Sequence, residues 1–207
     1  DNGNYVVVAT DDDDLAGNIQ NAGSVTLVNG STGAIIGTPV VGDDVSDHMG
    51  LAGITVLANN NYVILSNFDD EGILQDAGSA TLINGSTGAI IGTPLRGEKN
   101  DARFGANAIA LDNNNYAILS TLVDNDTILN AGSVVLVDGT TGSTIGTPIR
   151  GDSANDNIGQ SGLALANNNF VVASRNDDVD GISDAGSVML INGTTGALIG
   201  TPLSGDD

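Results

Sequence analysis

The chain has 207 residues, of which 40% are hydrophobic and 3% aromatic, and it contains no cysteine. This length and apolar content suffice for a buried core, whereas the lack of cysteine excludes a disulfide framework and a thiolate metal site. A net charge of −21 excludes the basic surface that nucleic-acid binding needs, and no apolar run reaches the roughly 20 residues that cross a bilayer. We therefore expect neither a nucleic-acid partner nor insertion into a membrane.

One segment of thirteen residues recurs four times along the chain. It reads VNGSTGAIIGTPV, INGSTGAIIGTPL, VDGTTGSTIGTPI and INGTTGALIGTPL, at 28–40, 83–95, 137–149 and 191–203. Its proline recurs at intervals of 55, 54 and 54 residues, as Pro39, Pro94, Pro148 and Pro202. The sequence therefore predicts a single repeat domain over 1–207, with units 1–50, 51–104, 105–158 and 159–207.

Each unit contains short β-type runs separated by turns. In the second unit these runs are GITVLAN (53–59), NYVILSN (61–67), GSATLIN (78–84) and AIIGTPL (89–95), called strands a, b, c and d below. The segments ANNN between a and b and NGSTG between c and d favour tight antiparallel hairpins, because Asn and Gly tolerate positive φ. The proline in strand d has no N–H to donate, so strand d is expected at a sheet edge.

Four antiparallel strands in about 54 residues are typical of one β-propeller blade. The predicted fold is therefore all-β, with four tandem four-stranded antiparallel blades in a propeller-like arrangement. The alternatives are a β-solenoid, whose coils are usually shorter, and an open superhelical array of blades. The first unit begins at the strand b run NYVVVAT without a strand a, so we expect an unpaired strand edge there. Either the chain is a segment of a longer repeat array, or an adjacent copy supplies the strand.

The loop between strands b and c is acidic and supplies the best candidate site. In unit four it reads NDDVDGISD and matches the pattern D/N-x-D-x-D-G-x-x-D. Alternate oxygen-bearing side chains around a glycine turn suit a calcium ion, because they converge on one point. The predicted calcium ligands are Asn176, Asp178, Asp180 and Asp184.

Weaker matches to this calcium pattern occur at Asp124 and Asp126 in unit three and at Asp70 and Asp76 in unit two. The alternative interpretation is structural. In it, Asp70, Asp124 and Asp178 form Asx turns with the backbone of their own loops, and no cation is required.

The order of these features resembles known repeats. The repeat resembles bacterial FG-GAP-type propeller repeats, which are related to the integrin α-chain propeller. The resemblance lies in the order of its segments: strand a, then NNNYVILS, an Asp-rich loop, DAGSATLINGSTGAIIGT and a G…D-x-φ-G loop. They look even more like the repeats of large secreted bacterial exoproteins that carry filamentous-haemagglutinin-type secretion domains. The resemblance implies an extracellular or cell-surface location and a role in adhesion or surface structure.

Two departures from the integrin pattern matter. The D-x-φ-G turn runs from Asp47 to Gly50 and again from Asp156 to Gly159, whereas in unit two we interpret it as a longer turn over 101–105. The acidic loop also follows strand b, whereas integrin repeats place their calcium loop before that strand. Direct transfer of the integrin calcium sites is therefore not expected.

The leading functional prediction is an extracellular structural or adhesive repeat protein that self-associates into an oligomer or filament through exposed strand edges. The similarity of the units favours this role, because a catalytic site usually breaks a repeat at one place. No enzyme is expected, since the one histidine, His48, lies in a loop turn and Lys99 belongs to no phosphate loop. The alternative is a calcium- or glycan-binding propeller module of a surface protein, which would bind through its variable loops.

Overall fold

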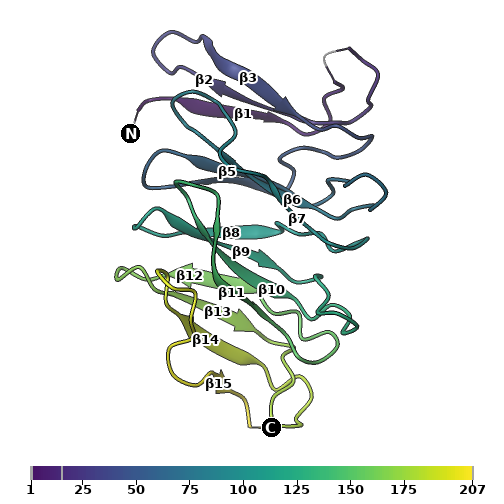
Figure 1. Ribbon diagram of the computed structural model, residues 1–207, viewed down its shortest axis with the longest axis vertical. Helices are drawn as coiled ribbons and strands as arrows, with labels where there is room; N and C mark the ends of the chain where they lie inside the picture. Colours follow the sequence, from purple (N-terminus) through teal and green to yellow (C-terminus); the bar gives the residue numbers. More distant parts are fainter. Residues whose placement is uncertain (1, 15, 207) are drawn as a thin grey trace.

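The structure is a computed structural model that describes residues 2–14 and 16–206. These residues form strands β1 to β15, and none of them forms a helix of the length and apolar character that would span a membrane. The strands are arranged in four antiparallel sheets, one for each unit. Figure 1 shows the sheets stacked in one row along the longest axis of the molecule, from unit one at the N-terminal end to unit four at the C-terminal end.

The strands follow the order b, c, d in unit one and a, b, c, d in the other units. Unit one contains β1 (Tyr5–Ala9), β2 (Ser24–Val28) and β3 (Ile35–Val41). Unit two contains β4 (Gly53–Val56), β5 (Tyr62–Ser66), β6 (Ser79–Ile83) and β7 (Leu95–Arg96). Unit three contains β8 (Asn107–Ala110), β9 (Asn115–Ser120), β10 (Ser133–Asp138) and β11 (Thr144–Arg150). Unit four contains β12 (Ser161–Ala164), β13 (Phe170–Ser174), β14 (Ser187–Ile191) and β15 (Leu203–Ser204).

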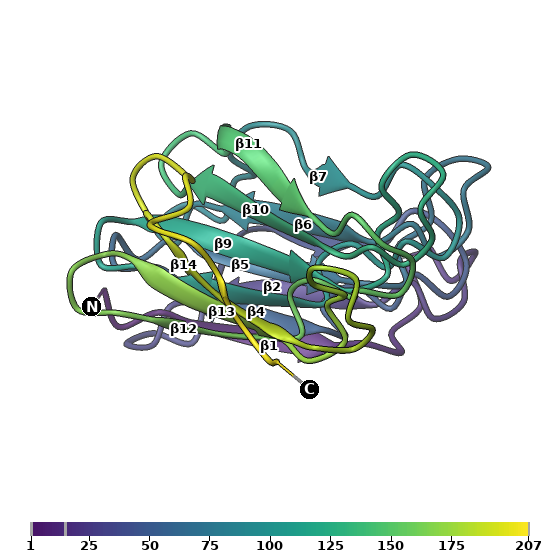
Figure 2. The same ribbon diagram turned by 90° about the horizontal axis from the view of Figure 1, so that it is seen from below.

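This arrangement confirms the all-β fold of four antiparallel units. The sheets do not close into a ring, so a propeller-like row of blades and an open array of blades both describe it. Among the described residues, the first sheet has three strands, in the order β1-β2-β3, which correspond to strands b, c and d. Strand d is the last strand of every sheet, which confirms the position expected from its proline. Figure 2 shows β7 and β11 along one edge of the stack and β4 and β12 along the opposite edge.

Strand d is less regular than the sequence predicts. In unit one Leu27 pairs with Ile36 and Val25 pairs with Val40, so three residues, 37–39, bulge out of the ladder. Unit three has the same shift, and in units two and four an isolated bridge precedes a strand of two residues. The bulge has two local causes, the missing N–H of the proline and a glycine at positive φ two residues earlier.

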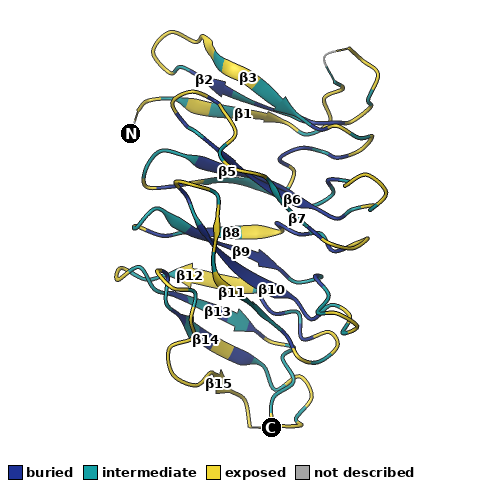
Figure 3. Cartoon of the chain, viewed as in Figure 1, coloured by how far each residue is buried: buried dark blue, intermediate teal, exposed yellow. Residues whose placement is uncertain are grey.

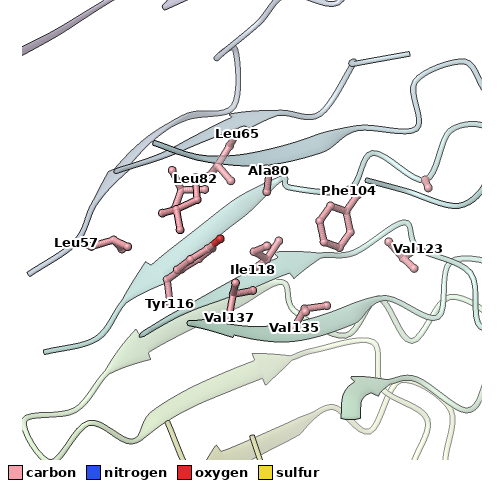
Figure 4. Packing of buried hydrophobic residues seen from close by; sticks show 12 residues of the cluster. Leu57, Leu65, Ala80, Leu82, Phe104, Tyr116, Ile118, Val123, Val135 and Val137 are labelled. Carbon is pink, nitrogen blue, oxygen red and sulfur yellow. The ribbon is translucent and has the colours of Figure 1, made fainter. Parts of the chain in front are cut away.

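The core lies between the sheets, in three apolar layers. Figure 4 shows the middle layer, in which Leu65 and Leu82 of unit two pack against Tyr116 and Val137 of unit three. The inner sheets are covered on both faces, so the b and c strands of units two and three are almost entirely buried (Figure 3). This explains why the b strands of these two units, YVILS and NYAILS, contain unbroken apolar runs rather than alternating ones.

The loops from strand d to the next unit have the same conformation at all three junctions. Each contains one residue whose φ is 46–51° and whose N–H donates to a carbonyl of its own unit: His48, Arg103 and Asn157. In this alignment Ala102 occupies the position of Asp47 and Asp156. The interpretation of a longer turn in unit two was therefore wrong, because the loop keeps its length and an alanine replaces the aspartate.

Candidate functional sites at the unit junctions

The acidic b–c loops fold around one aspartate, whose carboxylate accepts a backbone N–H from across the loop. In unit four Asp178 Oδ1 accepts from the N–H of Asp184 at 2.8 Å. The same bond joins Asn21 to Asp13, Asp76 to Asp70, and Asn130 to Asp124, at 2.8–3.0 Å. The donor residue has positive φ in all four units. These carboxylates therefore bind the backbone of their own loops, as the structural interpretation expects, but the bonds span six or eight residues and are not Asx turns.

The predicted calcium ligands of unit four are partly bonded to one another. Asn176 Nδ2 donates to Asp184 Oδ1 at 3.0 Å, and Asn176 Oδ1 accepts from Gln160 Nε2 at 2.6 Å. Asp180 is exposed, with a φ of 53°. Its counterpart Asp126 in unit three is also exposed, and its backbone carbonyl accepts from an ammonium group, that of Lys99. Calcium binding by these loops stays a prediction.

A different group of carboxylates gathers at the junction of units one and two. One oxygen each of Asp43, Asp47 and Asp69 lies within 4.8 Å of the others, and no other trio of Asp, Glu, His or Cys comes this close among the described residues. Asp43 and Asp47 belong to the loop after β3, and Asp69 follows β5. Asp43 is exposed, whereas Asp47 and Asp69 are 0% and 1% exposed. We call this group the junction carboxylates; the sequence pattern did not single it out.

The two buried junction carboxylates have different partners. Asp47 accepts backbone N–H groups from Asp44 at 2.7 Å and from Asp70 at 3.1 Å. Asp69 Oδ2 pairs with Arg96 Nη1 at 2.5 Å, and the hydroxyl of Ser79 is a second partner of this carboxylate, as Ser24 is of Asp12 in unit one. Burial raises the pKa of both side chains, that of Asp69 to about 6, because it disfavours the charged form.

A second candidate site is the surface through which successive units touch. We call the face of a sheet that meets the preceding unit its leading face and the opposite face its trailing face. The leading face of unit two presents Tyr62 and Ile64, which pack against Val25 and Leu27 on the trailing face of unit one. The same positions supply the other two apolar layers, so each junction uses one type of leading face and one type of trailing face.

A pair of asparagines clamps each unit to the next one. The side-chain amides of Asn59 and Asn61 both donate to the carbonyl of Gly139, at 3.0 and 2.8 Å. The same clamp runs from Asn2 and Asn4 to Gly85 and from Asn113 and Asn115 to Gly193. The corresponding pair in the last unit is Asn167 and Asn169, which has no following unit among the described residues.

The turn between strands c and d touches strand d of the preceding unit through two glycines. A Cβ on Gly88 would lie 2.7 Å from the carbonyl oxygen of Ile36, and one on Gly37 would lie 2.5 Å from that of Thr87. Neither position has room for a side chain. The contact recurs between Gly92 and Gly142 and between Gly146 and Gly196, whereas Gly33 and Gly200 at the two ends of the row have nothing within 4 Å.

Four sheets joined by the same contacts three times define an all-β tandem-repeat protein, in which each unit contacts only its neighbours in the row. The chain belongs to the DUF5650 family, described as a repeat of unknown function, and the family model matches residues 1–50, 56–93, 110–160 and 164–201. These matches assign one repeat to each of the four units. A comparison with curated proteins finds no match.

Proposed function

We propose that this protein is a structural repeat protein that assembles head to tail, with the trailing face of unit four in one copy covering the leading face of unit one in the next. The observation that carries the proposal is the exposure of Tyr5. This side chain is 51% exposed, although the aromatic side chains at the same position in the other units, Tyr62, Tyr116 and Phe170, are 3%, 1% and 0% exposed.

The rest of the leading face of unit one is also more exposed than the leading faces of the other units. Val7 is 47% exposed, whereas Ile64, Ile118 and Val172 at the equivalent positions are 0% exposed. Burying one such side chain stabilises an interface by about 1.5–3 kcal/mol. The last trailing face offers the complementary apolar surface, because Val188 is 40% exposed and its counterpart Val25 is 1% exposed. Both ends therefore present surfaces that the fold buries at every internal junction.

The polar contacts of a junction are also complementary at the two ends. At the leading end the carbonyl of Gly30 stands where Gly85 and its equivalents accept the asparagine clamp. At the trailing end Asn167 and Asn169 are the corresponding donors. A junction between two copies would thus repeat the internal ones. Because its two surfaces are different, the interface is heterologous, and repeated addition of copies gives a closed ring or an open filament.

A location outside the cell and a role in adhesion or surface structure complete the proposal. They are supported by the resemblance of the repeats to FG-GAP-type and large exoprotein repeats of bacteria. A non-catalytic role is supported by the likeness of the units, since the same residues recur at every junction for packing and hydrogen bonding.

Sedimentation velocity over a range of protein concentrations tests the assembly. For the wild-type chain we expect the mass to rise with concentration in multiples of the monomer. Val7→Asp would bury an unpaired carboxylate in the new junction, which costs about 3–5 kcal/mol and weakens association about 150- to 5000-fold.

Ile73→Asp is the matched control. Ile73 is 93% exposed in the b–c loop of unit two, away from both end faces, so this variant should associate like the wild type. A wild-type chain that stays monomeric up to about 1 mM would contradict the proposal, and so would equal association of the two variants.

A further inference from the structure

We propose that the junction of units two and three binds a small organic carboxylate with an apolar body, whose carboxylate group is held by Arg150. The site is a cavity of about 380 Å³ on the edge of the row where β7 and β11 lie (Figure 2). A cavity of this volume suits a ligand of small-molecule size. It lies within one copy of the chain, so binding there does not depend on head-to-tail assembly.

The cavity has an apolar floor and a charged rim. The floor consists of side chains from the apolar layer between the two units, Ala102, Phe104, Val123 and Val135, and Figure 4 shows the last three at one end of that layer. Three of the five basic residues of the chain line the cavity, Arg96, Lys99 and Arg150. Three acidic residues, Glu98, Asp124 and Asp126, also line it, so the pairing of the individual charges decides what the cavity can bind.

Arg150 has no carboxylate partner among the described residues. Its Nη1 donates to the backbone carbonyl of Asp124 at 2.7 Å, which is a neutral acceptor. The carboxylate of Asp124 is engaged elsewhere, because Oδ1 accepts the N–H of Asn130 and Oδ2 pairs with Lys99. A guanidinium has five N–H groups and binds a carboxylate through two of them. Arg150 therefore keeps donors for the carboxylate of a ligand.

The equivalent arginine of unit two shows where that carboxylate would bind. Arg96 Nη1 donates to the carbonyl of the residue after Asp69, at 3.3 Å. Arg150 donates in the same way to the residue after Val123, so both guanidinium groups have the same place in their units. Arg96 also pairs with the carboxylate of Asp69, whereas Val123 at that position offers none. The carboxylate of a ligand would take the position that the Asp69 carboxylate has in unit two.

A serine of unit three has lost the same partner. The hydroxyl of Ser79 is a partner of Asp69 in unit two, and its equivalent Ser133 is the cross-strand neighbour of Arg150. Ser133 is 1% exposed, and its hydroxyl has no hydrogen-bond partner among the described residues. Two donors that share a carboxylate in unit two thus lack one in unit three. The valine at position 123 therefore leaves groups that suit a carboxylate beside an apolar surface.

The apolar floor determines the rest of the ligand. Ala102 and Val123 replace two aspartates that are buried at the first junction, so the corresponding surface is apolar here. A purely ionic ligand would bind weakly to a chain with a net charge of −21, because the overall field repels anions. Each methylene group that a ligand buries on the floor should strengthen its binding about fourfold. We therefore expect a carboxylate that carries an alkyl or aromatic body.

Octanoate labelled with ¹³C at its carboxyl carbon is the probe, and NMR follows its carboxyl resonance as the full wild-type chain is added. We expect saturable binding of one octanoate per chain, with a dissociation constant below about 1 mM. Acetate lacks the apolar chain and octanol lacks the carboxylate. Each of them should compete with octanoate at least about tenfold more weakly than unlabelled octanoate does.

Three variants locate the carboxylate group of the ligand. Arg150→Gln removes the charge that holds it and should weaken octanoate binding at least about tenfold. Val123→Asp copies the arrangement of unit two, so its own carboxylate should pair with Arg150 and abolish binding. Arg175→Gln removes the same charge from an exposed residue of unit four that does not line the cavity, so this matched control should bind octanoate like the wild type. Circular dichroism checks that each variant keeps the strand content of the wild type.

Absence of saturable octanoate binding to the wild-type chain would overturn the proposal. Equal affinities of Arg150→Gln and Arg175→Gln would also overturn it, since Arg150 would then hold no carboxylate. Competition by octanol as strong as that by octanoate would exclude a site for carboxylates. None of these results depends on whether the wild-type chain assembles, which the sedimentation experiment decides separately.

Discussion

Asn59 and Asn61 show why the polar segment between strands a and b is nearly the same in successive units. Their amides converge on one carbonyl of the next unit, that of Gly139, and so fix the position of its turn. From the sequence alone, this asparagine cluster is interpreted as an ordinary hairpin turn. The clamp could not be seen there, because the acceptor lies 78 and 80 residues further along the chain.

The clamp predicts a measurable stability difference. The double variant Asn59→Ala with Asn61→Ala should lower the free energy of unfolding by about 1–3 kcal/mol, because two hydrogen bonds to one carbonyl are lost. Urea denaturation at low protein concentration measures this. The same change at Asn167 and Asn169 removes only the turn bond from the Asn169 N–H to Asn167 Oδ1, so it should cost less stability and should weaken self-association instead. Equal destabilisation by both double variants would refute the clamp.

The junction carboxylates show the limit of pattern matching at single residues. Asp69 and Asp70 are neighbours in FDDEG, yet Asp69 is buried at a unit junction and Asp70 caps its own loop. The available signal was the exchange of Asp47 and Asp69 for Ala102 and Val123 in the next junction. Interpretation of 101–105 as a longer turn hides this exchange, because it moves Ala102 away from the position of Asp47.

At the scale of elements, the bulged strand d and the turn before it together make the contact with the neighbouring units. The bulge in β3 carries Gly37 outward, where it meets Gly88 in the turn of the next unit. Both glycines have positive φ, and both backbones approach too closely for a Cβ. The thirteen-residue segment therefore has nearly the same sequence in every unit, because the segment of one unit packs against that of the next unit.

Two alanine variants separate the cost of close approach from that of backbone conformation. Gly33 and Gly88 both have a φ of 73°, but only Gly88 has a neighbouring backbone within 4 Å of an added Cβ. Gly33→Ala should cost about 1–2 kcal/mol of stability through its φ alone. Gly88→Ala should cost about 1–3 kcal/mol more, because the neighbouring turn must move. The urea midpoints of the two variants provide the comparison. Equal losses of stability would mean that the contact accommodates an added Cβ without cost.

At the scale of the whole molecule, the row has two different ends and carries a formal charge of −21. A leading face and a trailing face can bind each other, but two leading faces lack the complementary clamp and glycine contact. The proposed head-to-tail assembly would therefore be directional, as expected for a heterologous interface. The negative charge opposes association at low ionic strength and limits non-specific contacts between copies.

Mixing two end-blocked chains tests this directionality. Val7→Asp blocks the leading face and Val188→Asp blocks the trailing face, so each variant alone should remain monomeric. In a mixture, the intact trailing face of the first can bind the intact leading face of the second. We therefore expect a 1:1 heterodimer that does not grow further, measured by native mass spectrometry. Dimers of either variant alone would indicate a symmetric interface and contradict head-to-tail stacking.

Local signals in the sequence determined the repeat period, the strands b and c of each unit and the edge position of strand d. These features follow from turn residues, from proline and from apolar runs, all of which act over a few neighbouring residues. The family matches confirm the repeats, and the sheets confirm the strand order.

Only the tertiary structure decided how the sheets stack and which residues meet between them. The open row, the asparagine clamp and the paired glycines join residues of different units, and their partners are set by the packing of whole sheets. The junction carboxylates illustrate the same point, since Asp47 and Asp69 belong to two units and are brought together by the apolar layer beneath them. Such distant pairings leave no local pattern in the chain, so the candidate site appeared only once the units were in contact.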